Sequence, residues 1–165
     1  MPLIPFHLEL TDRAPIEVRD ALARQLIAFN EGLLGPSGTR PLAVLIRDAD
    51  GGLLGGLWGR TGFGWLFVEL LVVPDELRGQ GVGTRLLATA EDEAAARGCG
   101  GAWLDTLNPA AYRFYRRHGY ERFGALPDYP AGNPRSFLVK RFAARLIAFI
   151  FKFFNDFLNI NSVPN

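Results

Sequence analysis

Short apolar runs and helically spaced apolar residues succeed one another along most of the chain. Runs suited to β-strands cover residues 3–10, 42–47, 53–60, 65–73, 102–106, 120–125 and 135–142. Apolar residues recur at mixed helical spacings over 16–34, where one helix or a pair is expected, and also over 83–97 and 109–118. Hairpin-like strand pairs flank a middle section in which strands and helices alternate. The pattern therefore predicts a mixed sheet with flanking helices.

Residues with known capping preferences mark where these helices begin and end. Asp12 is the expected cap of the first helix, with Pro15 near its first turn. Gly98 suits the C-terminal end of the second helix. Asn108 followed by Pro109 is typical of a helix start, because Pro needs no N–H partner there.

Composition and charge exclude several classes of protein. The 165 residues, 48% of them hydrophobic, carry a formal net charge of +1, whereas nucleic-acid-binding domains are usually strongly basic. One cysteine and two histidines argue against a disulfide scaffold and a metal centre. The N-terminus lacks the basic stretch and long apolar run of a signal peptide. We therefore expect one cytoplasmic domain without bound metal.

The last 23 residues differ in composition from the rest of the chain. Phe, Ile, Lys and Asn supply 16 of residues 1–142 but 13 of residues 143–165. The apolar stretch from 145 to 160 is too short for a membrane span, which needs ~20 apolar residues. Its polar residues fall on one stripe of a helix, so residues 143–165 are expected to form an amphipathic segment. It is either a dimerisation helix, giving a homodimer, or an addition foreign to residues 1–142.

A glycine-rich stretch between a strand and a helix has the composition of an anion-binding site. Residues 78–83 read RGQGVG, just before the helix expected from 83. Unpaired N–H groups at a helix start and the helix dipole favour a phosphate, and Arg78 adds a guanidinium. The P-loop pattern fails because no Lys follows the glycines, and the dinucleotide pattern fails at its third glycine. A tight turn without a ligand is the alternative.

Two segments resemble the signatures of the GNAT superfamily of acyl-CoA-dependent N-acetyltransferases. Residues 73–87, VPDELRGQGVGTRLL, resemble its coenzyme-binding motif, and residues 108–120, NPAAYRFYRRHGY, are similar to its second signature. The likeness covers about residues 3–142. It implies an α/β (α+β) GNAT fold: a mixed, mostly antiparallel sheet of six to seven strands, flanked by about four helices and splayed at the coenzyme site.

The resemblance also implies a role for individual residues. Acetyl-CoA would donate its acetyl group directly to an amine of a small molecule or peptide. Tyr115 would act as general acid toward the leaving thiolate, and the N–H of Val73 would stabilise the oxyanion. Asn108 would contact the pantetheine arm, cap its helix, or do both. The residues expected to bind the coenzyme are Leu71, Val72, Val73, Arg78, Gly79, Gln80, Gly81, Val82, Gly83, Thr84, Asn108 and Tyr115.

The general base is less well defined. Glu69 is the only ionisable residue in the strand from 65 to 73, and alternation puts it on the side of Leu71 and Val73 unless a bulge intervenes. It could be the base, an anchor for the substrate amine, or part of a buried polar pair. Asp105 is a second candidate. His118, at a helix end, is expected to be a solvated cation.

The sequence thus predicts an N-acetyltransferase that uses acetyl-CoA and no metal. Two alternatives remain: an acyl-CoA sensor with the same pocket but no catalysis, and a binder of nucleotide phosphates. We expect neither nucleic acid nor a membrane span.

Overall fold

A computed structural model describes residues 4–142 and divides the chain into two compact units, one ending at Ser37 and the other beginning at Gly38. In the first unit, residues 4–10 form no strand, so the strand expected over 3–10 is wrong for the part described. A single helix, α1 (Ile16–Leu34), covers the whole range expected. Its N-cap is Pro15 rather than Asp12, and no side chain caps it. The predictions for residues 143–165 lie outside the described residues.

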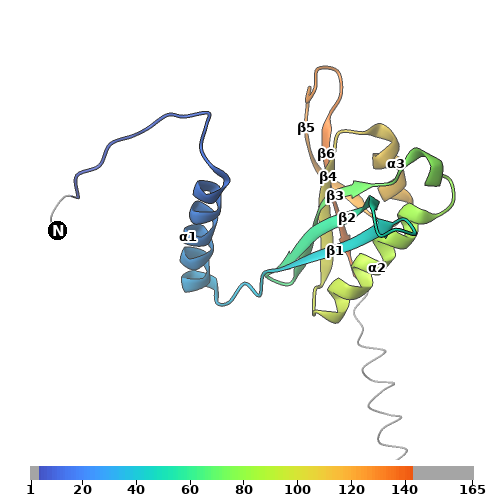
Figure 1. Cartoon of the computed structure of the whole chain (residues 1–165), viewed down its shortest axis with the longest axis horizontal. Helices are drawn as coiled ribbons and strands as arrows, with labels where there is room; N and C mark the ends of the chain where they lie inside the picture. Colours follow the sequence, from blue (N-terminus) through green and yellow to red (C-terminus); the bar gives the residue numbers. More distant parts are fainter. Residues whose placement is uncertain (1–3, 143–165) are drawn as a thin grey trace, which may run out of the picture. The chain divides into compact units, whose positions relative to one another are not determined.

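The second unit contains a six-stranded sheet and two α-helices (Figure 1). Its elements are, in chain order, β1 (Arg40–Arg47), β2 (Leu53–Gly62), β3 (Trp65–Val72), the 3-10 helix η1 (Asp75–Leu77), α2 (Val82–Ala96), β4 (Gly101–Thr106), α3 (Pro109–Arg117), β5 (Glu121–Leu126) and β6 (Arg135–Arg141).

The strand order is β1-β2-β3-β4-β6-β5, and β3–β4 is the parallel pair in an otherwise antiparallel sheet. The mixed, mostly antiparallel sheet expected from the sequence is confirmed. Within residues 4–142 the sheet has six strands, the lower of the two numbers expected. The same part of the chain has three α-helices, one fewer than expected. None of the helices in this range is long and apolar enough to cross a membrane.

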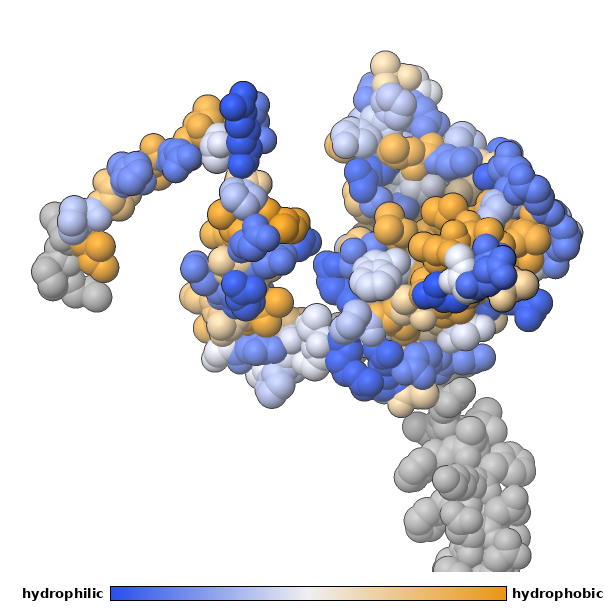
Figure 2. All heavy atoms as spheres, viewed as in Figure 1, coloured by the Kyte–Doolittle hydropathy of each residue, from blue (hydrophilic) through white to orange (hydrophobic). Residues whose placement is uncertain are grey.

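The core lies between one face of the sheet and helix α2. Leu57, Leu66, Leu104 and Leu138 are almost fully buried on that face. The helix contributes an apolar stripe at spacings of three and four residues: Leu86, Leu87, Ala90 and Ala94. Figure 2 shows hydrophobic residues at the centre of the viewed side of this unit, ringed by hydrophilic ones. Burial of these side chains holds β3 and β4 against α2 and so fixes the position of the loop that precedes the helix.

Candidate active site

The parallel strands β3 and β4 separate after three residue pairs. Pairing runs from Leu66–Ala102 to Val68–Leu104, although β3 continues to Val72 and β4 to Thr106. On its other side β3 stays paired with β2 as far as Val72. The end of β3 therefore has one edge whose backbone groups have no partner strand in the described part of the chain, a template for an extended ligand. The splay expected in the sheet is present.

The glycine-rich loop leads directly from this open edge into α2. Gly79 and Gly81 have φ values of +75° and +74°, which a residue with a Cβ adopts only with strain. Gly81 is the N-cap of α2, and no side chain caps the helix or places an acidic group in its first turn. The first N–H groups of a helix have no partner within it, so this turn offers donors to an anion.

A pocket of about 650 Å³ lies between the end of β3, the glycine-rich loop and α3. It is lined by Leu71, Val72, Val73, Leu77, Arg78, Gly79, Gly81, Val82, Gly83, Thr84, Asn108, Ala110, Ala111, Phe114, Tyr115, Arg117 and His118. Two of these residues are arginines and, among the described residues, no carboxylate lines the pocket. Its electrostatic character therefore suits an anionic ligand.

The pocket brings together all but one of the residues expected to bind the coenzyme. The exception is Gln80, whose side chain instead donates to the carbonyl oxygen of Glu76, at 2.8 Å. Among the lining residues that were not predicted from the sequence are Phe114 and His118, which share a helical stripe with Ala111 and Tyr115. Their spacing along residues 111–118 could have identified them.

Arg78 is held by groups at the base of the loop. Its Nε donates to the carbonyl oxygen of Val73 at 3.1 Å, and its Nη1 is paired with Asp75 at 2.7 Å. The guanidinium thus fixes the backbone at the end of β3 as well as lining the pocket. Both ends of the Arg78–Asp75 pair are largely exposed, so another anion can compete for the guanidinium at little cost.

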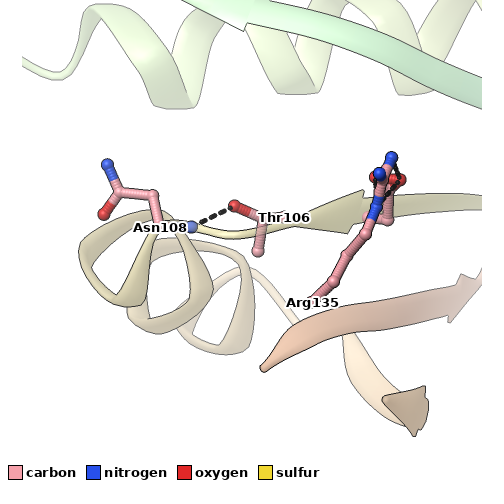
Figure 3. Close-up of polar contacts among 4 residues, drawn as sticks. Thr106, Asn108 and Arg135 are labelled. Atoms are coloured by element: carbon pink, nitrogen blue, oxygen red, sulfur yellow. Dashed lines mark hydrogen bonds and ion pairs between the residues drawn. The ribbon is translucent and has the colours of Figure 1, made fainter. Parts of the chain in front are cut away.

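Helix α3 begins at a well-formed cap. Asn108 Oδ1 accepts hydrogen bonds from the backbone N–H groups of Ala110 and Ala111, and Pro109 is the first helical residue. The N–H of Asn108 itself donates to Thr106 Oγ1 at 3.1 Å, which joins the end of β4 to the helix (Figure 3). The capping role expected of Asn108 is therefore confirmed.

Tyr115 extends from α3 into the wall of the pocket and is only 6% exposed. Burial, and to a lesser extent the negative charge of Asp105, raises the pKa of Tyr115 to about 12. The phenol therefore keeps its proton throughout the neutral range, the state required of a proton donor.

Glu69 does not lie on the face that strand alternation predicts. Trp58 pairs with Leu70 and Gly59 with Val68, so Glu69 is the extra residue of a β-bulge in β3. The bulge shifts the phase of the strand: Leu66, Val68 and Leu71 contact the core, and Glu69 does not line the pocket. The bulge allowed for in the sequence analysis is therefore present, and it takes Glu69 off the side of Leu71.

The carboxylate of Glu69 forms an ion pair with Arg60 of β2. Arg60 also lies over the ring of Phe67, with 5.0 Å between its Cζ and the ring centroid. Phe67 in turn stacks on Trp103, with ring centroids 3.9 Å apart. Glu69 is thus part of a polar pair, but the pair is not the buried one that was among the roles left open, because the side chains of Arg60 and Glu69 are 48% and 29% exposed.

Asp105, the second candidate base, is paired with Arg135 of β6. Both carboxylate oxygens accept from the guanidinium, with Nη2 2.6 Å from each (Figure 3). The Asp105 side chain is 17% exposed, and Arg135 also lies over the ring of Tyr129 at 5.4 Å. Such a two-point pair is stronger and better oriented than a single contact.

The ring of His118, expected to face solvent at a helix end, instead contacts two protein groups in the pocket wall. Its Nε2 lies 2.9 Å from Thr84 Oγ1, and its Nδ1 lies 2.8 Å from the carbonyl oxygen of Phe114. The ring joins the end of α3 to the first turn of α2 along the pocket wall. Only the fold brings these residues together, because 34 positions separate them in the chain.

Comparison with known proteins places this geometry in a family. Residues 8–120 match the Acetyltransferase (GNAT) family. The acetyltransferase Atu2258 of Agrobacterium fabrum is 45% identical over 81% of this chain and 97% of its own, and the blasticidin-S acetyltransferase of Streptomyces morookaense is 43% identical over 61% and 77%. A crystal structure of an Agrobacterium tumefaciens protein, 44% identical, covers 83% of this chain and 100% of its own, with a TM-score of 0.79. The chain belongs to the GNAT acetyltransferase family and is an acyltransferase.

Proposed function

We propose that the protein transfers the acetyl group of acetyl-CoA to a primary amine of a small molecule or peptide, by direct attack while both substrates are bound. The observation that carries the proposal is the pocket of about 650 Å³, which joins an unpartnered strand edge to a helix start and is lined by cations without a carboxylate in the described chain. A coenzyme with an amide-containing arm and a pyrophosphate requires both features.

The residues present fit this coenzyme. The backbone of Leu71, Val72 and Val73 offers hydrogen-bonding groups to the pantetheine arm as a further strand would. The N–H groups of residues 79–84 and the guanidinium of Arg78 suit the pyrophosphate. Asn108 keeps an amide group beside the pocket for the arm while its oxygen caps α3.

The bound coenzyme supplies an acetyl thioester, which is already activated toward amines. The N–H of Val73 donates to the carbonyl oxygen as negative charge develops there, and the Arg78–Val73 hydrogen bond steadies that backbone. Tyr115 gives its phenolic proton to the sulfur as the C–S bond breaks, then recovers a proton from solvent. This proton transfer is worth ~10²-fold in rate, because a thiol with a pKa near 8.5 is already a fair leaving group.

The attacking amine must lose a proton, and two carboxylates at the point where β3 and β4 separate are the groups available. Glu69 and Asp105 each follow the last paired residue of their strand, Val68 and Leu104. We assign Glu69 the role of accepting this proton or anchoring the amine, because its ion pair is more exposed and makes fewer contacts than the Asp105–Arg135 pair. A small-molecule acceptor is supported by the similarity to the blasticidin-S acetyltransferase.

Release of thiol from acetyl-CoA, measured across a panel of amines, tests this function. We expect at least one primary amine to accelerate release and to gain an acetyl group by mass spectrometry. Tyr115→Phe should lower that rate while binding of CoA, measured by calorimetry, stays close to that of the wild type. Binding of CoA with no amine-dependent release would contradict the enzyme and favour the acyl-CoA sensor.

A further inference from the structure

A second, smaller pocket, of about 230 Å³, lies beside the start of α3. We call it the Ser136 pocket, and the residues that line it are Thr106, Leu107, Asn108, Pro109, Tyr112, Arg122, Asn133, Pro134 and Ser136. Asn108 lines both this pocket and the coenzyme pocket, and the two otherwise face different sides of the first turns of α3. The Ser136 pocket therefore adjoins the place where the coenzyme arm is proposed to lie.

The register of the sheet places three polar side chains on one face at this end. Thr106 pairs with Ser136 across β4 and β6. The buried pair of Leu104 and Leu138 lies two residues earlier along β4, so Thr106 and Ser136 share the core face of the sheet with it. Arg122 pairs with Leu138 across β5 and β6 and lies on this face too. The apolar core thus ends in a polar pocket.

Several polar groups of this pocket have no partner within the described part of the chain. Ser136 is only 5% exposed, yet its hydroxyl makes no hydrogen bond with a described residue. No fully buried polar side-chain atom in residues 4–142 lacks a partner, so this oxygen is accessible from the pocket. The guanidinium of Arg122 and the hydroxyl of Tyr112 likewise have no partner among residues 4–142. These donors favour a ligand that accepts hydrogen bonds.

The charge and size of the pocket narrow the choice of ligand. Arg122 is the one cation among the described lining residues, and none of them is a carboxylate. A single guanidinium balances one unit of negative charge, as in a carboxylate, whereas a phosphate monoester carries about −1.5 to −2. Pockets for drug-sized ligands have volumes of about 300–1,000 Å³, so 230 Å³ suits one end of a small molecule.

We propose that the Ser136 pocket binds a carboxylate of the acceptor, so that the acceptor is a small amino acid or a similar amine with an acidic group. The inference rests on the proposed acetyl transfer and names the class of its substrate. Arg122 pairs with the carboxylate, and Ser136 donates to it. Thr106 lies two residues beyond Leu104, the last residue of β4 that pairs with β3, so the carboxylate is held close to the point where the strands separate.

Rates of thiol release from acetyl-CoA with matched acceptors test this specificity. Glycine, β-alanine, 4-aminobutyrate and 6-aminohexanoate are each compared with their carboxamides, as is any amino acid that the amine panel identifies. We expect kcat/KM for the best carboxylate to exceed that for its carboxamide about tenfold, because hydrogen bonds to a charged group are lost. Arg122→Gln should lower this ratio to about two, mainly by raising KM, and Ser136→Ala should lower it about threefold.

Arg113→Gln is the matched control, because Arg113 is an exposed arginine of α3 that lines neither pocket. It should leave the ratio unchanged. Binding of CoA and thermal unfolding should match the wild type in all three variants, which checks the coenzyme pocket and the fold. The ratio in Arg122→Gln also corrects for any difference in basicity between an acid and its amide, since the acceptors are the same.

The possible outcomes separate this inference from the function on which it rests. Equal rates with carboxylates and carboxamides would overturn the inference, as would an unchanged preference in Arg122→Gln. A preference for phosphoethanolamine, or acceptance only of amines without an acidic group, would also overturn it while leaving acetyl transfer intact. A protein with which no amine of any kind accelerates thiol release would overturn the proposed acetyl transfer itself.

Discussion

Glu69 and Asp105 are the first residues beyond the last pair that joins β3 to β4, so one carboxylate stands on each strand where the two separate. Each is paired with an arginine from the neighbouring strand on its outer side, Glu69 with Arg60 and Asp105 with Arg135. The sequence offered both as candidate bases. The Glu69–Arg60 and Asp105–Arg135 pairs differ in the number of hydrogen bonds and in exposure. Experiments can therefore separate the roles of the two carboxylates.

Replacing Glu69 should affect turnover more than binding of the coenzyme. With Glu69→Gln we expect kcat/KM for the amine to fall about 10²-fold, the usual contribution of a general base, while the dissociation constant for CoA stays within about threefold. Initial rates and calorimetry measure the two quantities. Arg60→Gln is the matched control: it removes the same ion pair but leaves the carboxylate, so a similar fall in both variants would assign Glu69 a structural role instead.

Tyr115 should lose its phenolic proton only at strongly alkaline pH, because it is buried and near Asp105. Its pKa of about 12 is raised above the ordinary value near 10, so the folded protein keeps the phenolic proton that the unfolded chain loses. Stability from this group is complete below pH 10 and is lost as the pH rises toward 12. Denaturant unfolding at pH 9 and pH 11 should show the loss, and Tyr115→Phe should show less of it.

The contribution of Asp105 to Tyr115 can be measured directly. Asp105→Asn should lower the pKa of Tyr115 toward its ordinary value, because the negative charge that opposes ionisation is gone. Absorbance at alkaline pH follows phenolate formation, with Tyr115→Phe used to identify the signal. Glu69→Gln should leave this pKa where it is, since Glu69 does not contribute to the shift.

Two substitutions of Asn108 separate its cap from its proposed contact with the pantetheine arm. Asn108→Ala removes the acceptor for the N–H groups of Ala110 and Ala111 and should lower the free energy of unfolding by about 1 kcal/mol. Asn108→Asp keeps an acceptor oxygen but loses the amide donors. We expect it to keep most of the stability and to raise the KM for acetyl-CoA; an unchanged KM would leave Asn108 with the cap alone.

Gly81 and Gly98 form a matched pair for the glycine-rich loop. Both have positive φ, +74° and +86°, and an added Cβ would meet no atom within 4 Å at either. Alanine at each position should therefore cost about 1 kcal/mol of stability through backbone strain. Only Gly81→Ala should weaken binding of CoA, because Gly81 lines the pocket and Gly98 does not. Equal affinities in the two variants would argue against the loop as the phosphate site.

Local signals in the sequence were sufficient to predict most of the helices and strands of the fold. Helix α1 covers the range in which helical periodicity predicted it, although its expected cap at Asp12 is wrong, and Asn108 with Pro109 starts α3. Periodicity and capping depend on residues close in the chain. The apolar stripe from Leu86 to Ala94 likewise predicted the buried face of α2. The extra strand over 3–10 was predicted from apolar content alone, which does not specify a pairing partner.

What the sequence by itself determined was the mixed sheet, its elements and the group of residues around the glycine-rich loop, since each depends on spacing along the chain. The tertiary structure decided which side chains meet. The bulge that moves Glu69 from the side of Leu71 arises from the register between β2 and β3, and alternation along one strand cannot reveal it. The hydrogen bond between Thr84 and His118 joins two helix ends that approach only because α2 and α3 pack beside β4.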